Sequence, residues 1–354
     1  MSQTDRRSFI TASLAAIGLG TASAVGRRIS AGQQSQSSIA ATKYRVDVHH
    51  HFGPPAWVAA MKGQKLLQPA NTAWTPEKSL EDLDRGGGAA AVLSITNPGL
   101  YLGDKQQTVR LARECNDFGA RVVQNHPMRF GLFAAMPLPD VDGTLKEIAY
   151  AYDQLHADGV GFMTSFGDTW LGNLAYRPVF EELNRRNAVV FVHPTAPDCC
   201  KSLDYGVAPA SLEYGTDTTR AITSICFSGY AAQFSNIRWI WSQGGGSMPF
   251  LAGRIAGAAE NRKTEMPNGM MAELRRMYYD LAGAANPGVV SSLRQLVGPD
   301  KILMGTDFPP GGHLLEQAQA IRELKTFTDA ELRMIERDNA ASLLPRLSSS
   351  SRAA

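Results

Sequence analysis

The feature that most limits how this chain can fold is a series of eight short apolar runs, rich in β-branched residues, between residues 44 and 308. The runs are continuously apolar rather than alternating, which predicts strands buried on both faces, as in a parallel sheet. We place the predicted strands at residues 44–49, 90–96, 130–134, 160–164, 188–193, 237–242, 277–281 and 302–306.

Amphipathic segments lie between these runs, most clearly at residues 77–85, 105–124, 142–157, 176–186 and 291–297. Eight alternations of strand and helix predict an α/β protein, a (β/α)8 TIM barrel spanning residues 44–347. An open, doubly wound sheet is the main alternative. No Gly-x-Gly-x-x-Gly follows the first strand, so nothing supports dinucleotide binding. The connections at 52–78 and 194–221 are long, as expected where substrate sites are built.

Charge and cysteine content exclude several classes of protein. The net charge is only +2 and no long basic run occurs, so a nucleic-acid partner is not expected. Four cysteines are present without a Cys-x-x-Cys pair, which excludes a zinc ribbon or a thioredoxin-like site. A chain of 354 residues does not need disulfide bonds to fold, so we expect buried free thiols.

The first residues read as a targeting segment. Arg6 and Arg7 precede a mildly apolar stretch at 10–22 and the small residues Ala22-Ser23-Ala24, which predicts a twin-arginine signal peptide over 1–24. The apolar stretch is too short to span a membrane. We therefore expect export to the periplasm by the twin-arginine machinery and no membrane association after cleavage. Residues 25–43 are predicted to be a flexible linker, and residues 348–354 a disordered tail.

Histidines and an aspartate occupy the carboxyl ends of three predicted strands. His49 and His51 alternate with His50, so they share one face of the first strand. His193 ends the fifth strand and Asp307 follows the eighth. A barrel places its active site at these strand ends, so the four side chains are predicted to bind one divalent metal ion.

The motifs in this order resemble those of the amidohydrolase superfamily, in the branch that contains aminocarboxymuconate-semialdehyde decarboxylase and the methylsalicylate decarboxylases. The resemblance extends over residues 44–343 and rests on Asp47-Val48-His49-His50-His51-Phe52, Val192-His193-Pro194, Gly244-Gly245-Gly246, Pro249-Phe250-Leu251-Ala252-Gly253-Arg254, Gly305-Thr306-Asp307-Phe308-Pro309, Trp74-Thr75-Pro76-Glu77 and Tyr278-Tyr279-Asp280. It implies that His49, His51, His193 and Asp307 ligate one ion, with zinc as the first expectation and manganese as the alternative. It also allows a homodimer.

The chain departs from the family at one informative position. Relatives usually carry His before the glycine run that follows the sixth strand, where this chain has Gln243. A glutamine amide can orient a neighbour by hydrogen bonding, but it cannot accept a proton near pH 7. The resemblance leaves Asp307 as the remaining catalytic base, beside an orienting role for Gln243.

Other residues are weaker candidates for the site. Trp74, Phe166 and Trp170 are candidates for an apolar aromatic pocket, and His313 for a substrate contact. Asp47 and Asp280 are candidates to hydrogen-bond the rings of ligand histidines. For each of these, plain packing or a surface position is an alternative interpretation.

Three functions follow from the sequence. The first is metal-dependent, non-oxidative decarboxylation of an aromatic, salicylate-like or unsaturated carboxylic acid, because this route needs no base at position 243. The alternative is metal-dependent hydrolysis of an ester, lactone or amide, with Asp307 accepting a proton from water. The second alternative is an inactive metal-binding barrel, which Gln243 alone favours. In the first case the partner is a small carboxylic acid.

Overall fold

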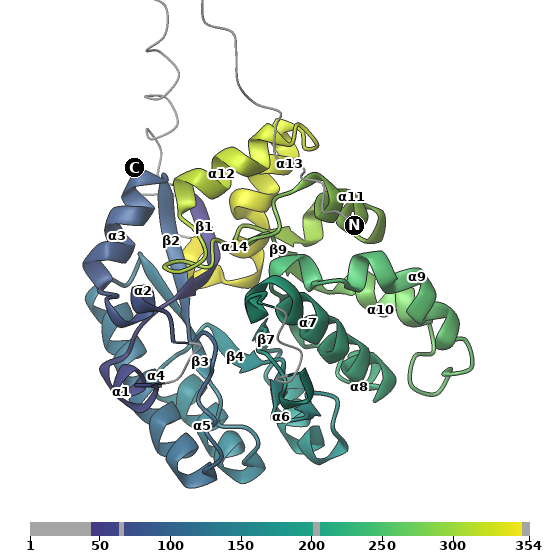
Figure 1. Cartoon of the computed structure of the whole chain (residues 1–354), viewed down its shortest axis with the longest axis horizontal. Coiled ribbons are helices and arrows are strands. Elements are labelled where there is room, and N and C mark those ends of the chain that lie inside the picture. Colours follow the sequence, from purple (N-terminus) through teal and green to yellow (C-terminus); the bar gives the residue numbers. More distant parts are fainter. Residues whose placement is uncertain (1–43, 64–66, 201–205, 349–354) are drawn as a thin grey trace, which may run out of the picture.

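A computed structural model describes residues 44–63, 67–200 and 206–348 of the chain. Eight parallel strands form one sheet in the order β1-β2-β3-β4-β7-β8-β9-β10 (Figure 1). The predicted signal peptide and linker, and the tail from residue 349 onward, lie outside the described residues. The strands are β1 (Arg45–His51), β2 (Gly88–Ser94), β3 (Phe130–Ala135), β4 (Gly159–Met163), β7 (Val189–His193), β8 (Arg238–Trp241), β9 (Tyr278–Asp280) and β10 (Ile302–Leu303).

The sheet closes on itself between its first and last strands. Val48 N donates to Met304 O at 3.0 Å, and His51 N donates to Phe308 O at 2.8 Å. His50 and Phe308 form a parallel bridge beyond the end of β10. The predicted (β/α)8 barrel is therefore confirmed, and each of the eight apolar runs overlaps one of its strands. β1 extends two residues further than predicted, because His51 pairs with Ser94 of β2.

Helices surround the strands (Figure 1). Several begin at a side chain that accepts a hydrogen bond from the first turn, including Thr75, Asp104, Asp140 and Asn286. The five predicted helices are present, although the third ends at Asp153 rather than at 157. The main helices are α3 (Pro76–Arg85), α4 (Lys105–Asn125), α5 (Val141–Asp153), α6 (Arg177–Arg185), α7 (Pro209–Phe227), α9 (Met248–Ala258), α10 (Met270–Arg276), α11 (Pro287–Leu296), α12 (Leu314–Glu323), α13 (Asp329–Arg333) and α14 (Asn339–Leu343).

The two long connections contain more structure than the sequence predicted. The first holds the short helices α1 (Pro55–Ala60) and α2 (Pro69–Thr72), and the second includes about the first two thirds of α7. A small hairpin, β5 (Ser165–Phe166) and β6 (Thr169–Trp170), follows β4. Strands of two residues are too short to produce a periodic pattern. The glycine and threonines of α7 weaken its helical signal.

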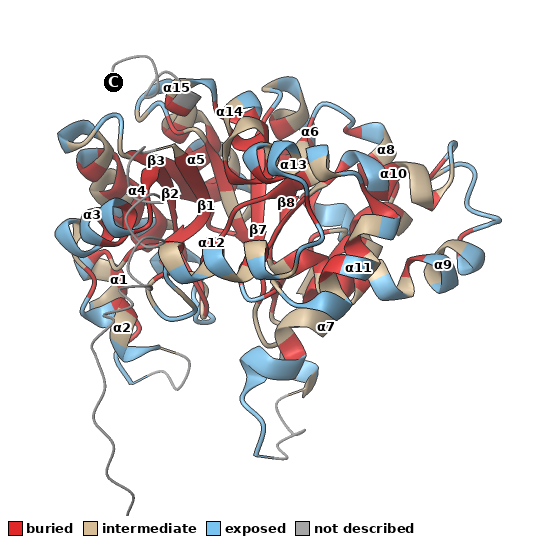
Figure 2. Cartoon of the chain, turned by 90° about the horizontal axis from the view of Figure 1, so that it is seen from above, coloured by how far each residue is buried: buried red, intermediate tan, exposed pale blue. Residues whose placement is uncertain are grey.

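The strands at the centre of the molecule are buried, as their red colour in Figure 2 shows. Phe191 stacks on Phe133 at 5.3 Å and contacts the His49 ring at 5.1 Å, so the apolar core ends directly beneath that histidine. The four cysteines are free, but only Cys115 and Cys226 are buried; Cys199 is exposed, unlike the expectation.

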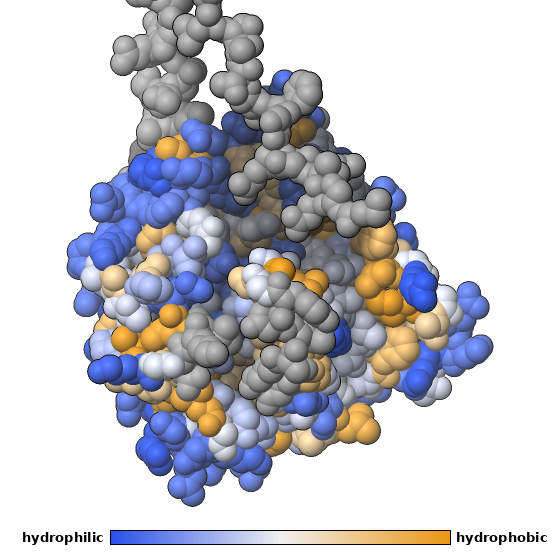
Figure 3. Space-filling view, in the orientation of Figure 1, coloured by the Kyte–Doolittle hydropathy of each residue, from blue (hydrophilic) through white to orange (hydrophobic). Residues whose placement is uncertain are grey.

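Hydrophilic residues predominate on the face seen in Figure 3, and apolar residues form several patches on it, one of them over α9. Phe250 on α9 is 81% exposed. None of the helices in the described part of the chain has the length and apolar character needed to cross a membrane.

Candidate metal centre

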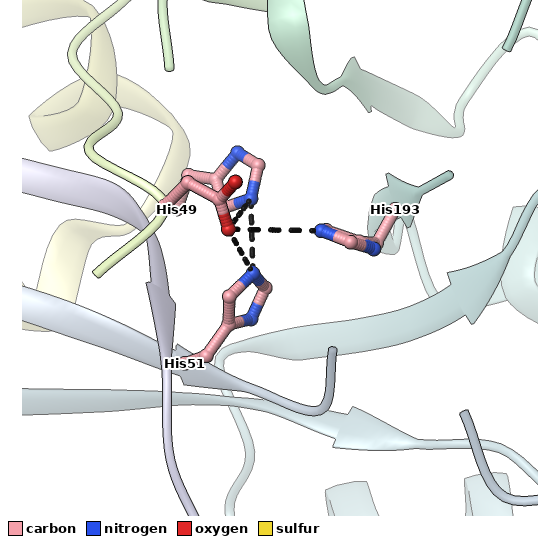
Figure 4. A group of neighbouring side chains, drawn as sticks. His49, His51 and His193 are labelled. Carbon is pink, nitrogen blue, oxygen red and sulfur yellow. Dashed lines mark hydrogen bonds and ion pairs between the residues drawn. The ribbon is translucent and has the colours of Figure 1, made fainter. Parts of the chain in front are cut away.

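Four side chains meet at the carboxyl end of the barrel. His49 and His51 come from the end of β1, His193 ends β7, and Asp307 follows β10 (Figure 4). Asp307 Oδ1 lies 2.9 Å from His51 Nε2, 3.5 Å from His49 Nε2 and 3.9 Å from His193 Nε2. One donor atom from each residue lies within 4.8 Å of the other three. The structure thus brings together the four residues that the strand ends indicated.

Each of the three imidazoles is oriented by a hydrogen bond at Nδ1, the nitrogen that does not face Asp307. His49 Nδ1 lies 2.9 Å from Asp280 Oδ2, and His193 Nδ1 lies 2.8 Å from the carbonyl oxygen of Pro194. His51 Nδ1 contacts both the carbonyl and the hydroxyl of Ser94, at 3.2 and 3.1 Å. These contacts turn all three Nε2 atoms toward Asp307, an arrangement typical of metal-binding histidines.

Burial and mutual charge shift the pKa values of the group in opposite directions. Burial lowers the pKa of His193, and lowers that of His51 to about 3 against the hydrogen bond of Asp307. Burial acts on His49 in the same sense, but the carboxylates of Asp280 and Asp307 outweigh it and raise its pKa to about 10. Burial opposes the charge of Asp307, yet the three imidazoles around it hold its pKa well below the usual range.

The donor set fits a divalent cation. His193 Nε2 is buried and has no hydrogen-bond partner among the described residues. Leaving a buried polar atom unpaired is unfavourable, so this atom indicates a missing partner. Metal–nitrogen and metal–oxygen bonds of about 2 Å place donors on either side of an ion up to about 4 Å apart. The observed spacing of 4.8 Å or less is close to that range.

Gln243 lies at the edge of the group. It follows β8 and begins the glycine turn η3 (Gln243–Gly245). Its backbone N–H donates to Asp280 Oδ1 at 2.9 Å, and its side-chain Nε2 lies 3.4 Å from Asp307 Oδ2. The long side-chain contact makes Gln243 a weak orienting neighbour of the Asp307 oxygen that faces away from the histidines.

Asp47 was predicted to hydrogen-bond the ring of a ligand histidine, but it contacts the ring of His50 instead. Asp47 Oδ2 contacts His50 Nδ1 at 2.9 Å and accepts the Thr306 hydroxyl at 2.6 Å, while Oδ1 accepts the backbone N–H of His49 at 3.1 Å. His50 Nε2 in turn lies 2.8 Å from Ser79 Oγ. This Asp–His–Ser chain is fully buried, so Ser79 is not accessible as a nucleophile. Asp47 instead joins β1 to the segment that carries Asp307.

The other candidate side chains lie around the centre rather than in it. Trp74 donates to Ser79 Oγ at 2.8 Å, and Trp170 donates to Asp217 Oδ1 at 2.7 Å. The side chain of His313 is 52% exposed and contacts Asp82 at 2.8 Å. Phe166 lines a small apolar cavity at the carboxyl ends of β2, β3 and β4, together with Ile95, Gly99, Leu100, Ala135, Met136, Gly161 and Met163.

The sequence analysis missed two residues that contact the candidate metal ligands, Ser94 and Tyr214. Ser94 ends β2, so the strand-end rule that found His193 also points to it, once the exact strand boundary is known. Tyr214 on α7 packs its ring edge-on to His193 at 6.1 Å. Burial, followed by the charge of Asp307, raises the pKa of Tyr214 above its usual range. No sequence pattern indicated Tyr214, because it lies in a segment interpreted as a loop.

Known proteins share this architecture. The solved structure of a dihydroxybenzoic acid decarboxylase from Polaromonas sp., with bound manganese and the inhibitor 2-nitroresorcinol, has a TM-score of 0.75 to this chain. It is 18% identical, and the match covers 86% of this chain and 98% of that one. At that identity the likeness establishes the fold alone.

Two relatives are closer in sequence. A decarboxylase of Aspergillus niger is 34% identical over 331 residues, covering 85% of this chain and 88% of that protein. The 6-methylsalicylic acid decarboxylase of Penicillium expansum is 33% identical over 323 residues, covering 86% and 97%. The sequence model of the amidohydrolase family matches residues 46–346, which include all four converging side chains. The chain belongs to the amidohydrolase family.

Proposed function

We propose that this protein is a metal-dependent, non-oxidative decarboxylase of an aromatic, salicylate-like carboxylic acid. The observation that carries the proposal is the convergence of three imidazoles and one carboxylate in a chain related over most of its length to decarboxylases. A glutamine at position 243 supports it further, because decarboxylation needs no proton acceptor there.

His49, His51, His193 and Asp307 would hold one divalent ion, which we propose to be zinc, with manganese as the alternative. Neutral imidazole and carboxylate donors suit both metals. When bound, the ion supplies Lewis-acid chemistry and a template for the substrate carboxylate. Asp280, Ser94 and the carbonyl of Pro194 keep the imidazoles oriented, so the donors need not rearrange to receive it.

Asp307 is proposed to deliver the proton that replaces CO2. The bond between the ring carbon and the carboxylate breaks, CO2 leaves, and the electron pair that remains on the ring carbon takes a proton from Asp307, whose ionised carboxylate first has to acquire that proton from solvent. Its Oδ1 faces the three histidines, whereas Oδ2 faces Gln243 and is the oxygen available to carry this proton. Water then restores the proton, so the net reaction consumes one proton for each CO2 released.

Hydrolysis of an ester, lactone or amide is the competing activity. It requires deprotonation of a water molecule, and the amide of Gln243 cannot accept that proton. Asp307 would have to serve alone as base. We therefore rank this reaction second, and an inactive metal-binding barrel third.

The test uses the purified protein loaded separately with zinc and with manganese. We expect CO2 release from at least one member of a panel of hydroxy- and methyl-substituted benzoates. In D2O the product should carry one deuterium at the carbon that lost CO2. Lactone or ester turnover without CO2 release would favour hydrolysis, and bound metal with neither activity would favour the inactive barrel.

We also propose that the protein is exported by the twin-arginine route. The family match begins at residue 46, so the Arg6-Arg7 segment lies outside the enzyme sequence. A folded, metal-loaded barrel is a suitable cargo for that pathway. Cell fractionation, with N-terminal sequencing of the exported protein, should show cleavage after Ala24. An Arg6→Lys/Arg7→Lys variant should stay in the cytoplasm, and unchanged export of that variant would contradict the proposal.

A further inference from the structure

A chain of three polar side chains crosses the carboxyl end of the barrel beside the metal centre. Thr195, two residues after His193, donates its hydroxyl to Asn97 Oδ1 at 2.5 Å. Asn97, which is 3% exposed, donates from Nδ2 to the hydroxyl oxygen of Tyr214 at 2.6 Å. The chain thus connects the segments that follow β2 and β7 to helix α7.

The direction of these bonds leaves a donor at the end of the chain. The Tyr214 oxygen accepts from Asn97, so its own proton is available to another acceptor. Among the described residues, none is recorded as accepting that proton. The ring of Tyr214 stands edge-on to that of His193, with 6.1 Å between the ring centroids and 73° between the planes, so this tyrosine lies beside the four-residue group.

Helix α7 holds Tyr214 rigidly in this position. The carbonyl of Gly215 accepts the N–H of Ser247 at 3.2 Å, just after the glycine turn that begins at Gln243. A Cβ at Gly246 would lie 2.1 Å from the Gly215 carbonyl oxygen, so the glycine permits this close approach. One turn further along α7, Asp217 accepts hydrogen bonds from the hydroxyls of Thr164 and Ser165. A donor fixed in this way loses little conformational entropy when it binds a ligand.

We propose that Tyr214 is a substrate-binding residue whose hydroxyl donates a hydrogen bond to a carboxylate oxygen of the substrate. The inference rests on the proposed decarboxylase function and names one of its recognition groups. A bond from a neutral hydroxyl to an anionic oxygen is charge-assisted and therefore stronger than a neutral one. The basic side chain of α7, Arg220, lies near Glu213 and Asp217 instead, at 3.7 and 3.8 Å.

The proposal predicts which kinetic constant changes. A carboxylate loses its negative charge as CO2 departs, so a hydrogen bond to it stabilises the bound substrate more than the transition state. Removal of such a bond raises KM and leaves kcat equal or higher. A group that assisted the chemical step would show the opposite pattern.

The first experiment compares Tyr214→Phe with the matched control Tyr230→Phe. Tyr230 is buried among Phe180 and Phe234, and its hydroxyl donates to the carbonyl of Asn173 at 3.1 Å. We expect Tyr214→Phe to raise KM about tenfold to a hundredfold, with kcat equal to or higher than that of wild type. Tyr230→Phe should leave both constants unchanged. An unchanged KM, or a fall in kcat alone, for Tyr214→Phe would overturn the proposal.

Asn97→Asp provides a second test that keeps the tyrosine. A carboxylate only accepts hydrogen bonds, so Asp at position 97 would draw the Tyr214 proton away from the substrate. KM should rise as in Tyr214→Phe, and the double variant should match Tyr214→Phe alone. A further loss in the double variant would show that the new charge repels the substrate directly, and would count against a role for the hydroxyl.

Binding separates this inference from the proposed function. Calorimetric titration of salicylate into the metal-loaded protein measures Kd without turnover. If the wild type releases no CO2 from any acid but binds salicylate about tenfold or more tightly than Tyr214→Phe does, the decarboxylase function fails and the binding role stands. Equal Kd values for the two proteins, or no binding by the wild type, overturn the role of Tyr214.

Discussion

The two ends of strand β1 both carry buried charge, but they are built differently. At its amino end lies Arg45, which is 1% exposed, and at its carboxyl end lie His49 and His51. The first cluster pairs its carboxylate completely. In the second, three imidazoles lie around a single oxygen of Asp307. Both clusters contain buried nitrogens without a hydrogen-bond partner among the described residues, Nε of Arg45 and Arg322 in the first and Nε2 of His193 in the second.

The amino-terminal cluster is centred on Glu336, whose side chain is fully buried. Arg322 donates to both carboxylate oxygens, at 2.9 and 3.0 Å, and the Tyr44 hydroxyl donates to one of them. Arg45 Nε lies 3.4 Å from the same carboxylate, and its Nη1 donates to the carbonyl of Gly86 at 2.8 Å. Burial, with the charge of Arg322, lowers the pKa of Arg45 only to about 10, so it remains charged at neutral pH.

This difference separates a structural cluster from a functional one. At the amino end, Tyr44, Arg45 and Arg322 surround the carboxyl of Glu336 and join β1 to the segment around it, although burial raises the pKa of Glu336 to about 8. At the carboxyl end, three imidazoles crowd around one carboxylate oxygen and compete for it. Such an arrangement is unfavourable for folding by itself, and is typical of a site that becomes complete only when a ligand binds.

The largest effect is expected when donors are removed from the carboxyl end. A His49→Ala/Asp307→Ala variant should bind no zinc or manganese by mass spectrometry and should show no detectable CO2 release. Without metal, it should unfold at the same urea concentration as metal-free wild type or at a higher one, because it loses an incomplete cluster. Retention of one equivalent of metal would exclude these residues as the ligands.

At the amino end of β1 we expect the opposite result, a loss of stability with no loss of metal binding or activity. Glu336→Ala leaves the buried Arg45 and the partly exposed Arg322 without their carboxylate and should lower the free energy of unfolding by about 3 kcal/mol. The folded fraction should keep its metal content and its kcat/KM. Urea unfolding measures the free energy of unfolding, and assays on the native protein measure metal content and kcat/KM.

Glu316→Ala is the matched control for this stability change. Glu316 pairs with Arg85 at 2.6 Å, but both side chains are substantially exposed, at 54% and 42%. Loss of an exposed pair should change stability by less than about 1 kcal/mol. Equal effects of the two substitutions would mean that burial does not distinguish the two kinds of ion pair here.

The sequence contained most of the fold but only part of the site. The eight strands were predictable because strands buried on both faces are continuously apolar, and strand ends located His193 and Asp307. Asp280 was found for the same reason. By contrast, Asp47 was assigned to a ligand ring, whereas it contacts His50. Tyr214 and Asn97 were missed because only tertiary packing brings α7 over the strand ends. Local sequence periodicity does not predict such a contact.

A smaller effect is expected at Asp280, which orients the proposed ligand His49 by a hydrogen bond but is not itself a proposed ligand. Asp280→Asn weakens the hydrogen bond that orients His49 and removes the negative charge beside it. We expect metal affinity to fall about 10- to 100-fold, measured by competition with a chelator. Asp300→Asn, at an exposed residue paired with Lys301 at 3.8 Å, should leave affinity unchanged. Equal affinity of both variants would make Asp280 a packing residue only.

The smallest effect is expected at Gln243, because its side chain lies 3.4 Å from Asp307 Oδ2, at the far limit of a hydrogen bond. The backbone N–H of Gln243, bound to Asp280 at 2.9 Å, is retained in any substitution. Gln243→Ala should therefore lower kcat/KM less than about tenfold.

A loss of more than a hundredfold in Gln243→Ala would instead place this amide in the chemical step. Gln243→His then sharpens the comparison between decarboxylation and hydrolysis. Histidine restores a side chain that can accept a proton near pH 7. If position 243 decides between the two reactions, this variant should gain lactone hydrolysis while it keeps the metal. If it gains none, the choice of reaction lies in the substrate contacts around Asn97 and Tyr214, and the glutamine is only a neighbour of Asp307.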